Sequence, residues 1–200
     1  MSSDVAQHLA RSLWIAALMA LALVLPGCGA SKAPRAVAYV QGRGVSRLAL
    51  THWITVKRVE LESAGSGTAP SRAEVQQKAL EFLITADWLE GESAADGVEV
   101  SASEVSTSYR HLVDSRAGPA FVAGMKRRGI SEADELQVLR LGALAQKLRE
   151  RVALDSHSLG EKRVGEAVAA FVAAYRQRWK QRTTCMPGYV IAECRNGPPL

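Results

Sequence analysis

The chain has 200 residues, a formal net charge of +5, and a composition that is 48% hydrophobic and 22% charged. This length suits one domain with short extensions, and this hydrophobic content excludes a wholly disordered protein. Aromatic residues make up only 6% of the chain while Ala, Leu, Arg and Glu are common, which favours helices over strands. The positive charge suits anionic headgroups or acidic chains, and we expect no nucleic-acid partner because the N-terminus predicts export.

The N-terminus has the pattern of a lipoprotein signal peptide. An unbroken apolar stretch runs from Leu13 to Leu25 and is followed by Pro26. A helix of this length covers about 20 Å, which is less than the roughly 30 Å hydrocarbon core of a bilayer, so a cleaved signal sequence is the better interpretation. The next residues, Leu25-Pro26-Gly27-Cys28, resemble a lipobox, in which the cysteine is alkylated by a diacylglyceryl group before a peptidase removes the preceding segment.

This pattern predicts where the mature protein begins and where it is located. We expect residues 1–27 to be the signal peptide, Cys28 to carry the lipid, and residues 28–35 to form a tether. The protein is then exported and held by its lipid on the outer face of a bacterial membrane. The alternative, an uncleaved anchor with an incidental cysteine, places the same domain outside the cytoplasm.

The two remaining cysteines, Cys185 and Cys194, predict a disulfide. They form an even pair in an oxidising compartment, and closing so short a loop stabilises a domain by roughly 2–3 kcal/mol. The alternative is two free thiols. A metal site is disfavoured because none of the four histidines lies near these cysteines in the sequence.

Capping signals predict about six helices between residues 36 and 195. Patterns of serine followed three residues later by an acidic residue begin at Ser71, Ser101 and Ser131, and each has the form of a helix start. The helix after Ser71 is apolar almost all round, so we expect it at the buried centre. Further boundary signals are an N-cap at Ser46, a first helical position at Pro119, a stop at Gly129 and a break at Gly160 before the last helix.

Two short β-prone runs lie at opposite ends of this helical segment, at residues 36–40 and 189–192. Each run alone leaves unpaired edges, so pairing with the other is the economical solution. We therefore expect a small two-stranded sheet that joins the N- and C-terminal ends of the mature chain. Residues 196–200 are expected to form a C-terminal tail.

Three motifs occur in an order typical of one family. Residues 37–42 read Val-Ala-Tyr-Val-Gln-Gly ahead of Ser46, residues 97–105 read Gly-Val-Glu-Val-Ser-Ala-Ser-Glu-Val, and Phe121 precedes Gly-Ile-Ser-Glu-Ala-Asp at 129–134. This order resembles the N-terminal chaperone domain of SurA and PrsA type foldases. The resemblance implies a mainly α SurA N-terminal-like domain over residues 36–195 that holds unfolded exported polypeptides.

One departure from that family is large. Full-length members carry a parvulin-type prolyl isomerase domain before the final helix, whereas here only residues 154–160 or so separate the last two predicted helices. No isomerase active site fits in that length, so the resemblance implies the chaperone portion alone. His52, His111 and His157 are scattered, and we expect no catalytic centre, metal or cofactor.

Holding unfolded chains requires exposed apolar surface. The candidate client-binding residues are Trp53, Trp88, Tyr109, Phe121 and Met125, with the last two favoured because their short helix has less to bury. Two alternatives stay open. One is a diverged or accessory peptidyl-prolyl isomerase, and the other is a structural lipoprotein that docks one folded partner.

Overall fold

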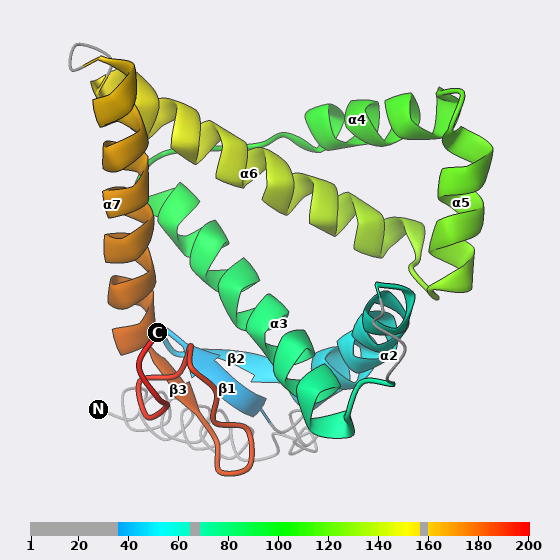
Figure 1. The fold of residues 1–200 in the computed structure, drawn as a ribbon, viewed down its shortest axis with the longest axis horizontal. Coiled ribbons are helices and arrows are strands. Elements are labelled where there is room, and N and C mark those ends of the chain that lie inside the picture. The colour runs from blue at the N-terminus through cyan, green and yellow to red at the C-terminus, as the bar shows by residue number, and fades with distance from the viewer. Residues whose placement is uncertain (1–35, 65–68, 157–159) are drawn as a thin grey trace, which may run out of the picture. The chain divides into compact units, whose positions relative to one another are not determined.

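The computed structural model describes residues 36–200 except 65–68 and 157–159. The predicted signal peptide, Cys28 and the tether lie outside the described residues. The described chain is mainly helical, with six helices and a small three-stranded antiparallel sheet (Figure 1). In this part of the chain, every helix is too short or too polar to span a bilayer.

The sheet has the strand order β2-β1-β3, with β1 at Ala36–Val40, β2 at Arg43–Ser46 and β3 at Thr183–Cys185. Strands β1 and β2 are joined by a two-residue turn in which Gln41 and Gly42 both have positive φ, 50° and 83°. Positive φ at both central residues is the geometry of a tight hairpin turn that matches the twist of the flanking strands. The central strand β1 thus brings the two ends of the domain together.

The predicted sheet is correct in joining the two ends of the domain but wrong in its strands. The C-terminal partner of β1 is Thr183–Cys185, which follows the last helix directly, and not residues 189–192. That β-prone run lies in a series of turns, in which the Tyr189 N–H donates to the Met186 carbonyl at 3.0 Å. The hairpin strand β2 was not predicted, since Gly42 and Gly44 indicate the end of an extended run.

The predicted disulfide between Cys185 and Cys194 is present, with the two Cα atoms 5.6 Å apart and both cysteines buried. The residues after it are bonded to the domain. The Asn196 side-chain amide donates to the Cys185 carbonyl at 3.1 Å, and the buried Lys180 ammonium donates to the Pro198 carbonyl. The disulfide loop and residues 196–198 therefore close over the end of the last helix.

The helices begin where the capping signals predict. Ser46, Ser71 and Ser101 each accept a hydrogen bond from the backbone N–H three residues later, and Ser131 does the same with Asp134. A side-chain oxygen at this position satisfies an otherwise unpaired N–H of the first turn. The helices are α2 Arg47–Ser63, α3 Arg72–Ala95, α4 Ala102–Asp114, α5 Gly118–Arg127, α6 Glu132–Ser156 and α7 Glu161–Gln181.

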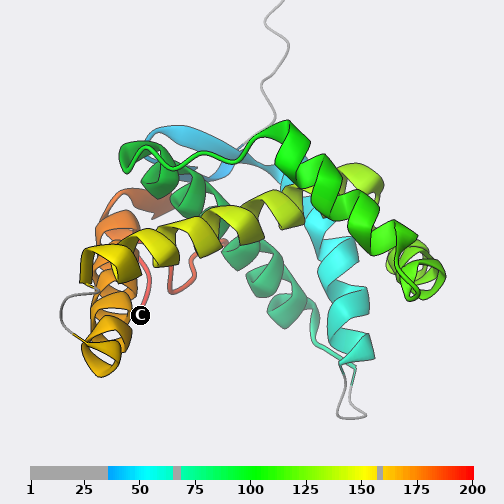
Figure 2. The same ribbon diagram turned by 90° about the horizontal axis from the view of Figure 1, so that it is seen from above.

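Helix α3 supplies the centre of the core, as its apolar pattern predicts. Its Leu80, Ile84 and Trp88 side chains are buried together with residues of the sheet, α2 and the end of α7. A smaller cluster, which includes Val105 and Leu144, joins α4 to α6. Figure 2 shows the arrangement of the helices from above.

The contact between α3 and α7 is unusually close at Gly91. A Cβ atom at this position would lie 2.0 Å from the Trp179 ring, so only glycine allows the indole to pack here. The Trp179 indole N–H donates to a Glu92 carboxylate oxygen at 2.6 Å, and the Trp88 indole N–H donates to the Thr183 hydroxyl at 2.7 Å. Both buried indoles are therefore paired, as buried donors must be to avoid a desolvation cost.

We predict that Gly91→Ala destabilises the domain by about 1–3 kcal/mol, because the added methyl group overpacks the α3–α7 contact. The matched control is Gly142→Ala in α6, where an added Cβ meets no atom within 4 Å. That change should stabilise by about 0.5–1 kcal/mol, since alanine restricts the unfolded chain and favours helix. Urea unfolding followed by circular dichroism measures both, and equal effects of the two substitutions would contradict the packing argument.

We predict that reducing the Cys185–Cys194 disulfide lowers the free energy of unfolding by roughly 2–3 kcal/mol, because the open loop gains conformational entropy in the unfolded chain. Thermal unfolding with and without a thiol reductant measures the change. The double variant Cys185→Ser, Cys194→Ser should unfold at the lower temperature and be insensitive to reductant. An unchanged midpoint of the fully reduced wild type would contradict this prediction.

Candidate functional site

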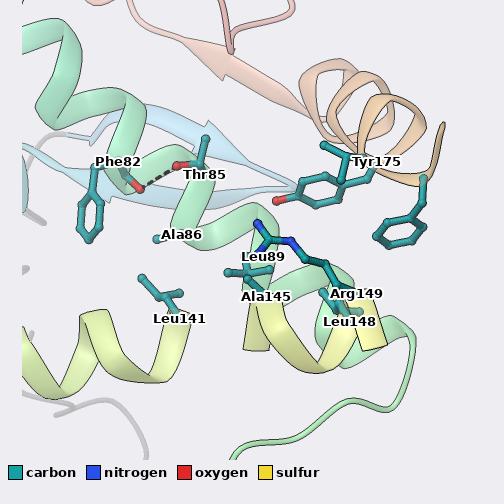
Figure 3. A pocket seen from close by; sticks show the side chains of 11 residues that line it. Phe82, Thr85, Ala86, Leu89, Leu141, Ala145, Leu148, Arg149 and Tyr175 are labelled. Atoms are coloured by element: carbon teal, nitrogen blue, oxygen red, sulfur yellow. Dashed lines mark hydrogen bonds between the residues drawn. The ribbon is translucent and has the colours of Figure 1, made fainter. Parts of the chain in front are cut away.

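An open apolar pocket lies between α3, α6 and α7 and has a volume of about 300 Å³ (Figure 3). Its lining comes from short stretches of the three helices that lie far apart in sequence. The residues are Phe82, Thr85, Ala86 and Leu89 of α3, Leu141, Ala145, Leu148 and Arg149 of α6, and Phe171, Val172 and Tyr175 of α7. We call this pocket the cleft.

The cleft exists because the helices present small side chains at this place, which leave the space between the helices unfilled. Ala86 of α3 and Ala145 of α6 present only methyl groups. Large side chains surround them, and the rings of Phe171 and Tyr175 lie parallel with centroids 6.3 Å apart. Val172 on the same helix remains 37% exposed. The cleft therefore offers preformed apolar surface that water still reaches.

A buried polar cluster lies next to the cleft. The pKa of the Tyr175 hydroxyl lies far above its usual range. Burial is the main cause, and the neighbouring Glu92 carboxylate raises this pKa further. Glu92 is itself held by Trp179 and by the Arg178 guanidinium. Tyr175 thus keeps its proton at physiological pH and offers the cleft a neutral hydroxyl.

The other polar groups of the cleft differ in how they are paired. The Thr85 hydroxyl donates within its own helix, where the Glu81 and Phe82 carbonyls lie at 2.7 Å and 3.2 Å, the second marked in Figure 3. Arg149 is the one charged residue of the lining, and Figure 3 shows its side chain running from α6 across the cleft toward Tyr175. The cleft is therefore an apolar site with a cation at its edge.

Helix α6 is fixed in place by polar contacts on faces other than the one that lines the cleft. Arg140 pairs with Glu90 of α3 at 2.6 Å. Lys147 pairs with Glu104 of α4 at 2.6 Å, and its ammonium also donates to the Glu99 carbonyl at 2.9 Å. These contacts hold the α6 wall of the cleft against α3 and α4.

The predicted client-binding residues lie elsewhere. Trp53, Trp88 and Met125 are buried in the main core, with exposed fractions of 4%, 0% and 5%. Tyr109 and Phe121 are half-buried and meet edge to face between α4 and α5, with ring centroids 6.4 Å apart. None of these five residues lines the cleft.

The cleft residues appear in the sequence only as parts of apolar helix faces. In the sequence, Phe171, Val172 and Tyr175 lie on one stripe of the last helix together with Trp179. The structure buries the end of that stripe, at Trp179, and leaves the preceding turns lining an open space. Helical spacing identifies an apolar face, but it carries no signal for which part of that face a neighbouring helix covers.

Of the four histidines, only His52 and His111 belong to the described residues, and they lie on different helices, α2 and α4. Within the described ranges, no three His, Cys, Asp or Glu residues gather closely enough to hold a metal ion. The His52 ring instead lies 2.9 Å from a carboxylate oxygen of Asp134, which joins α2 to the start of α6. His157 lies outside the described residues.

Comparisons of the chain with models of known protein families, with curated proteins and with solved structures find no match. The chemistry of the cleft and the motifs of the sequence are therefore the guides to its function.

We predict that the Glu104–Lys147 contact stabilises the domain at neutral pH and is lost in acid. The Lys147 ammonium and the hydrogen bonds from Ser101 lower the pKa of Glu104 from 4.5 to about 2. A carboxylate whose pKa is lower in the folded state stabilises it above the unfolded pKa, so this contribution fades as pH falls from 4.5 toward 2. Urea unfolding of Glu104→Gln and wild type at several pH values tests this.

The variant should be less stable than wild type at pH near 6, and the two should converge near pH 2. Lys147→Met removes the same ion pair from the other side and should flatten the same part of the pH profile. A difference in stability between wild type and Glu104→Gln that stays constant over this pH range would contradict the assignment.

Proposed function

We propose that this chain is a membrane-anchored holder of unfolded exported polypeptides, tethered through a lipid on Cys28, and that the cleft receives apolar segments of its clients. The observation that carries the proposal is the cleft itself, which is apolar, preformed and open between three helices. The proposal assigns client contact to the cleft residues instead of to Trp53, Trp88 and Met125.

The physical argument concerns what an unfolded chain offers. Its apolar side chains are exposed to water, and covering them releases roughly 25 cal/mol for each Å² of apolar surface that is buried. A receptor that accepts many sequences needs apolar surface without a specific pattern of hydrogen bonds. The cleft has that composition, because eight of the eleven side chains that line it carry no polar group, among them Leu89, Leu141 and Phe171.

The sequence supports the same function independently. The lipobox predicts an extracytoplasmic location, where exported chains arrive unfolded. The ordered motifs resemble the chaperone domain of SurA and PrsA type foldases. In addition, α6 ends at Ser156 and α7 begins at Glu161, which leaves no length between them for an inserted isomerase domain. We therefore propose a holding activity without prolyl isomerisation.

The test is suppression of aggregation of a reduced, unfolded client by the purified protein, followed by light scattering. Wild type should suppress aggregation at a few-fold molar excess. Val172→Asn places an amide in the cleft, and about fivefold more of this variant should be needed for the same suppression of aggregation. Burying a whole valine side chain contributes roughly 1.5–3 kcal/mol to binding, and only part of that is lost here. The matched control is Val138→Asn in α6, since Val138 is 39% exposed against 37% for Val172 and does not line the cleft.

Two results would count against the proposal. No suppression by wild type at several-fold molar excess would remove the holding activity, and equal losses in Val172→Asn and Val138→Asn would remove the cleft as its site. A protease-coupled proline isomerisation assay tests the isomerase alternative. The rate of isomerisation in the presence of the protein should equal the rate in buffer alone. Membrane pull-downs should recover heterogeneous partners, whereas a docking lipoprotein would recover one stoichiometric partner.

A further inference from the structure

The charge at the edge of the cleft is unusual for its surroundings. Among the eleven residues that line the cleft, Arg149 is the only one that carries a charge. No carboxylate belongs to the lining, so nothing in the wall neutralises this guanidinium. Within the described residues, Arg149 takes part in none of the ion pairs or side-chain hydrogen bonds of the domain.

Other cations of α6 are engaged by the domain. Arg140 pairs with Glu90 at 2.6 Å, Lys147 pairs with Glu104 at 2.6 Å, and an Arg151 guanidinium nitrogen donates to the Asp96 carbonyl at 2.7 Å. These three residues fasten α6 to α3, to α4 and to the link between them. Arg149 lies on the same helix but faces the cleft, where the described part of the fold provides it with no such partner.

We infer that the cleft prefers apolar peptide segments that carry a carboxylate side chain next to a large apolar residue, with Arg149 pairing with the carboxylate. This inference rests on the proposed function and names the class of client segment. A guanidinium presents a planar set of donors that matches a carboxylate, and because Arg149 is exposed, we expect a modest contribution from the pair.

The size of the cleft favours a peptide over a lipid. Its volume of about 300 Å³ is at the small end of the range for small-molecule sites, which is roughly 300–1,000 Å³. Such a space accommodates an anchoring side chain of a longer polymer better than a whole long-chain acyl group. The Tyr175 hydroxyl and the Arg149 guanidinium then offer polar partners to a peptide bound in the cleft.

The test uses the purified full chain and two labelled peptides that differ at one position, Phe-Leu-Glu against Phe-Leu-Gln in an otherwise uncharged sequence. Fluorescence anisotropy should show that wild type binds the Glu peptide about two- to fivefold more tightly, which is the size expected of a partly exposed ion pair. Arg149→Gln should bind both peptides with the affinity that wild type shows for the Gln peptide. The preference should shrink at high salt.

The control variant is Arg116→Gln, which makes the same change of charge at an exposed position between α4 and α5. It should keep the preference for the Glu peptide, and Arg149→Lys should keep part of it. Equal binding of the two peptides by wild type overturns the inference and leaves the proposed function standing. A preference that persists in Arg149→Gln also overturns it, because the net charge of the chain then explains the effect.

Two further outcomes concern the occupant. If neither peptide binds wild type, the proposed function fails together with the inference. If laurate binds in an Arg149-dependent manner while both peptides do not, the cleft is a lipid site and the inference is wrong. Displacement of the bound Glu peptide by unlabelled peptide, but not by laurate at the same concentration, is the expected result.

Discussion

The close approach of α7 to α3 at Gly91 is the contact on which the rest of the domain depends. Without a Cβ at Gly91, the Trp179 indole packs directly on α3 and reaches the Glu92 carboxylate. One turn further along the chain, Thr183 begins β3 and accepts the Trp88 indole N–H. This contact thus holds the end of the last helix, which also packs along α6, and places the strand that closes the sheet beside the N-terminal strand of the domain.

This contact also explains why a cleft is present. The cleft residues of α3 and α7 lie within about three turns before Gly91 and Trp179 in each helix. The cleft therefore lies directly beside the place where these two helices approach each other closely. The α6 wall is held separately, through Arg140 and Lys147 on its other faces. Leu141 and Leu148 of this wall are themselves buried, and apolar surface of the cleft stays accessible on α7, where Val172 is 37% exposed.

The fold was predictable from the sequence to the extent that its signals are local. Serine caps at Ser46, Ser71 and Ser101 act over three residues, and each of these predicted helices starts where such a bond forms. The disulfide followed from two cysteines nine residues apart and the predicted compartment. The β1–β2 hairpin was not predicted because Gly42 and Gly44 indicate the end of an extended run, and a Gln-Gly turn is a weaker hairpin signal than Asn-Gly or Asp-Gly. The candidate site was not predicted, since none of the five aromatic or Met candidates lines the cleft.

The sequence by itself determined the helices, their starts and the disulfide, because each of these depends on residues close together in the chain. The tertiary structure alone decided which apolar surface stays open and which charge of the described residues faces it. Trp88 and Phe171 look equally apolar in the sequence, yet one is fully buried and the other lines the cleft. Their burial depends on how α3, α6 and α7 cross, and those crossings bring together residues more than 80 positions apart, such as Glu92 and Trp179. Interactions over such separations leave no periodic or capping signal in the sequence.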